Sequence, residues 1–253
     1  MGMADLYRLD GDYDKAEKGY RNAAEVEPGN FDAQYYHGLM LHVLSRVQEA
    51  ISKYLTALRI RPDDFQANLN LSAAYYQLGE SAQGLRYAQQ AVKLNPKDGP
   101  GRLNLGTLYA DLQRDKDAVG EYQQAAELMP LTAGLLTNLA DSLGRLKRYD
   151  EMRNTLEQLV KTAPSPLAHE RLGFALFKLN LRDDARLSFQ RALAIDGDYY
   201  PALNGVGVCE LNTWLESKST DVAAKQRAFE ALRKSLMVRP NQGAIQEILT
   251  RYQ

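Results

Sequence analysis

The sequence predicts an all-α fold: a solenoid in which antiparallel pairs of helices stack along the chain. Three observations predict it. Between the punctuating prolines, apolar residues follow the three- and four-residue spacing of amphipathic helices. Small residues recur where two helices would have to touch. Above all, prolines recur at a fixed interval of 34 residues, at Pro28, Pro62, Pro96, Pro130 and Pro164. Repetition at this period is typical of stacked helix pairs.

Residues 99–132 show one unit clearly. Apolar residues from Leu105 to Leu112 define a first helix, and those from Ala118 to Ala126 define a second, with a break near residues 113–116. Proline then ends the second helix because it has no amide hydrogen and its ring clashes with the preceding turn. Residues able to cap the next helix follow each proline: Asn30, Asp64, Asp98, Thr132 and Ser165.

Small residues alternate with large ones at the expected helix contacts. The first helices carry Gly38, Ser72, Gly106, Ala140, Gly173 and Gly207, and the second helices carry Ala16, Ala50, Gly84, Ala118 and Ala185. Bulky residues stand four places further on in the second helices, at Tyr20, Tyr54, Tyr122, Leu156 and Phe189. We interpret all of these residues as core.

We expect a single domain over residues 1–253, with about seven repeats and a C-terminal capping helix at 241–253. The expected repeats are approximately 1–30, 31–64, 65–98, 99–132, 133–165, 166–199 and 200–240. Pro240 lies 76 residues after Pro164, which implies nine inserted residues near 214–224. We expect the first helix of that repeat to extend past Trp214 and the second to be capped by Thr220 or Asp221. The first unit begins inside its expected first helix, which favours a truncated chain with Met1 and Gly2 as remnants of cloning.

This pattern resembles the tetratricopeptide repeat, whose signature combines Leu-Gly, a tyrosine, an alanine followed four places on by an aromatic residue, and a proline. The best match is Leu105, Gly106, Tyr109, Ala118, Tyr122 and Pro130, followed by His37, Gly38, Leu41, Ala50, Tyr54 and Pro62. The signature tryptophan is missing from every unit. The resemblance covers nearly the whole chain, and it implies a right-handed superhelix whose first helices line a concave groove.

Composition argues against several other functions. The 31 basic and 32 acidic side chains give a formal net charge of −1, which does not favour nucleic acid as a partner. No apolar run approaches the roughly 20 residues that span a bilayer, so we expect no membrane insertion. The three histidines lack the spacing of metal ligands, Cys209 is alone, and there is no phosphate-binding loop. We therefore expect no cofactor and no catalysis. A cytoplasmic location is favoured, or a periplasmic one if an upstream signal has been removed.

The resemblance places function in the polar positions of the first helices. The sixth residue of successive units gives Asn70, Asn104 and Asn138, followed by Arg171. A carboxamide can hydrogen-bond to the backbone of an extended peptide without reading its side chains. Similar asparagine ladders occur in the peptide-binding repeat domain of the O-linked N-acetylglucosamine transferases. The alternative is that asparagine at this position serves helix packing.

Other groove candidates occupy later positions of the first helices: Tyr76, Gln77, Thr107, Asp111, Asp141, Arg145, Phe174, Phe177 and Lys178. Arg145, Arg171 and Lys178 could form a basic patch for an acidic side chain or a terminal carboxylate, unless they pair with Asp141 and Glu170. Tyr35 and Tyr36 are either aromatic anchors or buried.

The leading hypothesis is a scaffold that binds an extended peptide or a partner protein in the groove. One alternative is the substrate-recruiting region of a larger enzyme, such as a glycosyltransferase; another is a self-assembling platform, although we expect a monomer. Chaperone-binding members of the family hold a terminal carboxylate in a clamp, and the comparable positions here are Tyr35, Leu39, Asn70, Pro100 and Asn104. Only Asn70 matches, so we do not expect chaperone-tail binding.

Overall fold

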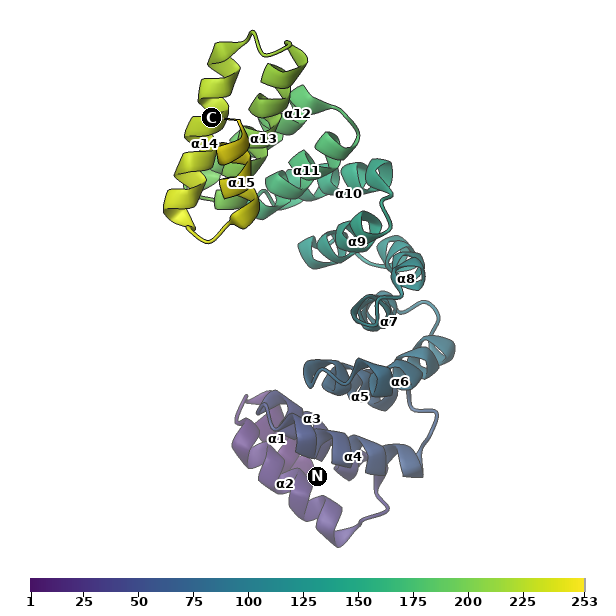
Figure 1. Cartoon of the computed structure of the whole chain (residues 1–253). Coiled ribbons are helices and arrows are strands. Elements are labelled where there is room, and N and C mark those ends of the chain that lie inside the picture. The colour runs from purple at the N-terminus through teal and green to yellow at the C-terminus, as the bar shows by residue number, and fades with distance from the viewer. Residues whose placement is uncertain (253) are drawn as a thin grey trace. The chain divides into compact units, whose positions relative to one another are not determined.

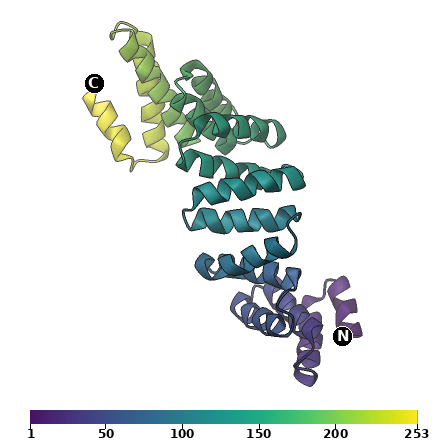
Figure 2. The ribbon, with the colours of Figure 1, turned by 90° about the vertical axis from the view of Figure 1, so that its right-hand side faces the viewer.

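The computed structural model describes residues 1–252. These residues form fifteen α-helices and no strand, so the all-α prediction is confirmed. Contacts between residues divide the chain into two compact units, Met1–Pro130 and Leu131–Gln253, which we call the N-terminal unit and the C-terminal unit. Within each unit, helices that follow one another in the chain pack against one another (Figures 1 and 2).

The N-terminal unit consists of four helix pairs. Their bounds are α1 Gly2–Leu9, α2 Tyr13–Val26, α3 Phe31–Val43, α4 Val47–Ile60, α5 Phe65–Gln77, α6 Ser81–Leu94, α7 Gly99–Asp111 and α8 Asp115–Leu128. Each second helix contacts its own first helix and also the first helix of the next pair. The stack therefore buries both faces of every internal first helix.

The C-terminal unit consists of three helix pairs and one further helix. Their bounds are α9 Ala133–Arg145, α10 Tyr149–Thr162, α11 Pro166–Lys178, α12 Arg182–Ile195, α13 Tyr200–Glu216, α14 Val222–Val238 and α15 Gly243–Arg251. α15 packs against α14. Leu249 of α15 belongs to an apolar cluster with Leu211 of α13 and Leu232 of α14, so this helix covers part of the last pair.

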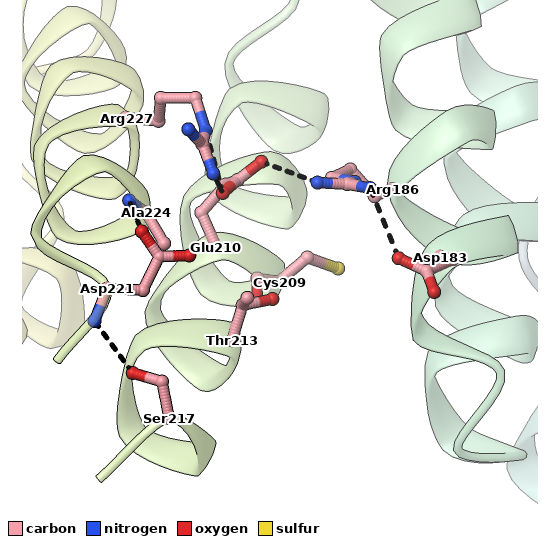
Figure 3. A network of polar contacts seen from close by, with 9 residues as sticks. All are labelled: Asp183, Arg186, Cys209, Glu210, Thr213, Ser217, Asp221, Ala224 and Arg227. Atoms are coloured by element: carbon pink, nitrogen blue, oxygen red, sulfur yellow. Dashed lines mark hydrogen bonds and ion pairs between the residues drawn. The ribbon is translucent and has the colours of Figure 1, made fainter. Parts of the chain in front are cut away.

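Two helices of this unit are longer than the others. α13 and α14 each have 17 residues, whereas the preceding first and second helices have 13 and 14. The loop between them lies where the sequence places its insertion. Asp221 caps α14, because its Oδ1 accepts a hydrogen bond from the amide of Ala224 at 2.9 Å. The Ser217 hydroxyl oxygen accepts one from the amide of Asp221 at 2.9 Å, which closes the loop (Figure 3).

The helix caps expected after each proline are present. Asn30, Asp64, Asp98, Thr132 and Ser165 are all N-cap residues, and the side chain of each accepts a hydrogen bond from the amide three residues later. This contact satisfies one of the free amides at a helix start. The sequence therefore indicated correctly where the first helices α3, α5, α7, α9 and α11 begin.

The small-to-large contacts form the core, as predicted. Tyr20, Tyr54 and Tyr122 are almost fully buried, at 0 to 1% exposure. A Cβ added to Gly106 would lie 2.7 Å from Cδ1 of Tyr122, and one added to Gly173 would lie 2.7 Å from Cε1 of Phe189. Glycine lets the first helix approach the aromatic ring of its partner closely.

A second recurring contact joins successive repeats, and the sequence analysis did not anticipate it. The carbonyl oxygen of the punctuating proline accepts a hydrogen bond from the side chain six residues later. Gln34, Asn68, Arg102 and Gln246 donate to Pro28, Pro62, Pro96 and Pro240, respectively, over 3.2, 2.9, 2.7 and 3.1 Å. These bonds satisfy a carbonyl that the helix leaves without a partner where it ends.

None of the helices formed by residues 1–252 combines the length and the apolar character needed to cross a bilayer.

Candidate functional site

The first helices form one face of each unit. α3 contacts α5, α5 contacts α7, and α11 contacts α13. Second helices of successive pairs share no contact as extensive in the described part of the chain. α9 is joined to α11 by an ion pair between Asp141 and Arg171. We call the surface of α3, α5 and α7, and that of α9, α11 and α13, the inner face of the respective unit; the second helices form the outer face.

Two of the candidate asparagines are bound to the preceding repeat. The Asn70 Nδ2 donates a hydrogen bond to the Tyr35 hydroxyl at 2.9 Å, and the Asn104 Nδ2 donates to the Ser72 hydroxyl at 2.6 Å. Burial raises the pKa of Tyr35 to about 12, so its hydroxyl stays protonated at neutral pH. Each asparagine keeps one N–H and its carbonyl oxygen for other partners. These two side chains therefore contribute to the packing between helices of the N-terminal unit.

The other candidates of the N-terminal unit lie at the C-terminal ends of α5 and α7. Tyr76 is 43% exposed, and Asp111 is exposed as well. Gln77 is also exposed, and its Oε1 lies 2.9 Å from Nε2 of His42, which donates to it. These residues lie on the surface, but no contact joins the three to one another.

In the C-terminal unit, Arg171 already has a partner. Its Nη1 lies 2.7 Å from Oδ1 of Asp141. Burial raises the pKa of Asp141, and the positive charge of Arg171 opposes that shift. Arg145 is exposed at the end of α9, and its Nη2 donates to the Ser142 hydroxyl at 3.0 Å. Asn138 is half-buried on α9.

A pocket of about 210 Å³ lies between α11 and α13 of the C-terminal unit. Phe174 and Phe177 of α11 form one wall, and Pro201 and Val208 of α13 form the other. The buried ring of Phe189, from α12, closes the floor. Most of the pocket surface is therefore apolar, and much of it is aromatic.

Three polar side chains also line this pocket: Glu170 and Lys178 of α11, and Asn204 of α13. Glu170 is half-buried, and burial raises the pKa of its carboxyl group above the usual range. The Asn204 Nδ2 donates to Oε1 of Gln242 at 2.7 Å. Of the residues that the sequence proposed for binding, the pocket brings together Phe174 and Lys178.

The exposed wall of the pocket is held in place by its neighbours. Phe174 is 38% exposed, and its ring meets that of Tyr149 edge to face, with centroids 6.2 Å apart and planes at 76°. The ammonium nitrogen of Lys178 lies 5.3 Å from the centroid of the Phe174 ring. The ring therefore faces solvent in a defined position.

Gly205 explains why a pocket opens at this repeat. A Cβ added there would lie 2.5 Å from Cδ1 of Phe189, so any side chain would collide with the ring. Gly205 stands 34 residues after Arg171, at the position where earlier repeats have asparagine. The sequence analysis missed Gly205 and its neighbour Asn204 because it did not continue the asparagine series into the last repeat.

The outer face of the C-terminal unit also has a groove, of about 640 Å³, between α10 and α12. Leu172 lies in it, Leu187 lines it and is 45% exposed, and buried His169 contributes one edge. Burial lowers the pKa of His169, and the nearby charge of Arg191 lowers it further.

The described residues contain no cluster of three or more histidine, cysteine or acidic side chains that could hold a metal ion. Cys209 is buried, and burial raises the pKa of its thiol to about 11, so it is not a thiolate at neutral pH. His37 is also buried, and its Nε2 lies 3.0 Å from Oε1 of Glu17. Both of these side chains belong to the core.

The family model described as tetratricopeptide repeat matches residues 1–65, 69–131 and 137–200. The chain therefore belongs to the tetratricopeptide repeat family, a class of all-α scaffolds for protein–protein interaction, and the resemblance found in the sequence is confirmed.

Solved structures share the fold. The C-terminal part of a repeat-containing protein from Cytophaga hutchinsonii superimposes with a TM-score of 0.73 at 12% identity, over 97% of each chain. YrrB, described as a repeat protein with an unusual peptide-binding site, matches with a TM-score of 0.67 at 17% identity, over 78% of this chain and 97% of its own. A repeat protein from Parabacteroides merdae matches with a TM-score of 0.62 at 19% identity, over 99% and 96%. No curated protein matches the sequence significantly.

Proposed function

We propose that the chain is a non-catalytic scaffold that binds an extended segment of a partner protein on the inner face of its C-terminal unit. The observation that carries the proposal is the aromatic pocket between α11 and α13. The peptide-binding site named for YrrB, which has the same fold at 17% identity, is consistent with this function by analogy.

The size of the pocket favours a side chain over a small-molecule ligand. Sites for cofactors and drug-sized molecules usually enclose about 300 to 1,000 Å³, whereas a cavity of about 150 Å³ holds a benzene ring. A pocket of about 210 Å³ therefore suits one large side chain of a peptide. The fixed, exposed ring of Phe174 is the kind of aromatic group that anchors protein interfaces.

The first helices also offer groups for the peptide backbone. Asn138 on α9 presents a carboxamide, which can donate to a carbonyl oxygen and accept from an amide. Asn70 and Asn104 each retain one N–H and an oxygen after bonding to the preceding repeat. In this proposal the asparagines add backbone contacts, and the pocket supplies the anchor.

A peptide selection tests the proposal. Random dodecapeptides displayed on phage are selected on the wild-type chain, and the affinities of the selected peptides are then measured by fluorescence polarisation. Two variants remove comparable exposed apolar side chains from the same unit: Phe174→Ala on the inner face and Leu187→Ala on the outer face. We expect Phe174→Ala to weaken binding about tenfold or more, as loss of an interface anchor does. Leu187→Ala is expected to change it less than about twofold.

Circular dichroism must show equal helicity for the two variants. If Leu187→Ala weakens binding and Phe174→Ala does not, the peptides bind the outer groove and the proposal is wrong.

A further inference from the structure

Glu170 is a carboxylate without a counter-charge at the edge of the aromatic pocket. It is half-buried, and it forms no hydrogen bond or ion pair with any of residues 1–252. Arg171 acts on it only at a distance, because that guanidinium is bound to Asp141 at 2.7 Å. A charge that is partly removed from water without a partner is costly, so a cationic group bound beside Glu170 would be stabilised.

Lys178 cannot supply this charge. It lies on the same helix two turns further on, about 12 Å along the axis at the α-helical rise of 1.5 Å per residue. Its ammonium group lies over the ring of Phe174 instead. The pocket therefore has a negative end at Glu170 and a positive end at Lys178, with aromatic side chains between them.

The second polar group without a partner is also an acceptor. Asn204 uses its Nδ2 to donate to Gln242, which leaves its Oδ1 buried without a donor. Both groups at the pocket that lack a partner, the Glu170 carboxylate and the Asn204 carbonyl, thus require N–H donors. A side chain with several donors and no acceptor meets that requirement.

We propose that this pocket binds a basic side chain of the partner segment, with arginine as the best fit. The guanidinium group has five N–H donors and no acceptor, and its flat face stacks on aromatic rings. Its methylene stem suits the apolar walls formed by Phe174 and Phe177. An acidic side chain would face Glu170 with the same charge, and a purely apolar side chain would leave that carboxylate unpaired. This inference rests on the proposed function and names the chemistry of the anchor.

The test uses the tightest dodecapeptide from the selection whose binding depends on Phe174. Each basic residue of that peptide is replaced in turn, arginine by citrulline, which has nearly the same shape but no charge, and lysine by norleucine. Affinities are measured for the wild type, for Glu170→Gln and for Glu230→Gln. The last variant removes a carboxylate from the exposed surface of α14 and serves as the matched control.

We expect one position at which citrulline weakens binding to the wild type by about tenfold to a hundredfold, the usual effect of losing a charge-assisted hydrogen bond. The same replacement should cost less than about twofold on Glu170→Gln and should keep its full effect on Glu230→Gln. Peptides that need Phe174 but contain no basic residue, or an equal citrulline effect on wild type and Glu170→Gln, would overturn this inference and leave the proposed function standing. Peptides that do not need Phe174 would overturn both.

Discussion

At the scale of single residues, the buried histidines connect the fold to pH. His37 of α3 is 4% exposed and lies against Glu17 of α2, which is equally buried. Burial lowers the pKa of His37, and the neighbouring carboxylate opposes that shift without cancelling it. The folded chain therefore holds this imidazole neutral under conditions in which the unfolded chain begins to protonate it.

The sign of the effect on stability follows from proton linkage. Because the pKa is lower in the folded state, the unfolded state binds more protons as the pH falls below about 6.5. We expect the free energy of unfolding to be highest above that pH and to decrease between pH 7 and pH 5. His37→Gln keeps an N–H donor for Glu17 but does not titrate, so its stability should fall less over this range. Urea unfolding of both proteins at several pH values checks this, and equal losses would show that His37 contributes nothing.

The residue scale also shows where sequence reasoning stopped. Caps such as Asp64 and Asp98 were predictable because a capping side chain acts on amides three residues away. The partners of Asn70 and Asn104 were not, because Tyr35 and Ser72 lie 35 and 32 residues earlier and come into contact only when the repeats stack. Periodicity locates a polar side chain on a helix, but it does not decide whether a neighbouring repeat or a ligand binds it.

At the scale of helices, close packing depends on particular glycines. Gly106 of α7 has Tyr122 in the way of a side chain, whereas nothing lies within 4 Å of a Cβ built on Gly120 of α8. Both glycines are inside helices, where alanine is intrinsically more stable by roughly 0.5 to 1 kcal/mol. The difference between them isolates the contact between α7 and α8.

We expect Gly120→Ala to raise the free energy of unfolding by about 0.5 to 1 kcal/mol. Gly106→Ala should lower it, because an overpacked core costs roughly 1 to 3 kcal/mol and outweighs the gain in helix propensity. Urea midpoints of the two variants and the wild type measure the effect. Equal stabilisation by both substitutions would mean that α7 can move away from Tyr122 at little cost.

The long helices of the last repeat are joined by a buried carboxylate. Glu210 of α13 is 2% exposed and lies between Arg186 of α12 and Arg227 of α14 (Figure 3). Its Oε1 accepts from Nη1 of Arg186 at 3.1 Å, and its Oε2 accepts from Nε of Arg227 at 2.9 Å. Both arginines are partly exposed, at 34% and 50%, so each can return to water if its bond is lost.

This asymmetry predicts non-additive effects on stability. Arg186→Ala or Arg227→Ala alone should cost roughly 1 kcal/mol, because the other arginine still neutralises Glu210. The double variant should cost roughly 3 to 5 kcal/mol, because the carboxylate is then buried without a counter-charge. A double-mutant cycle by chemical denaturation measures the coupling. A double variant whose loss equals the sum of the single losses would show that Glu210 gains access to water once the arginines are gone.

At the scale of the whole molecule, the most regular positions serve packing and the departures from regularity make the candidate site. The 34-residue spacing of prolines and the small-to-large contacts were sufficient to predict helix pairs, and the core has them as expected. At the sixth position of each unit, Asn70 and Asn104 bind the preceding repeat, whereas Gly205 allows a pocket to form. The pocket could not be predicted from a repeat pattern, because it exists where the chain departs from that pattern.

The central claim is that the inner face of the C-terminal unit anchors an extended segment of a partner protein. The most direct measurement is a crystal structure of the chain with the tightest peptide from the selection. The account predicts an extended peptide across α11 and α13, with one side chain in the pocket formed by Phe174, Phe177 and Phe189. A peptide bound in the groove between α10 and α12 would contradict it.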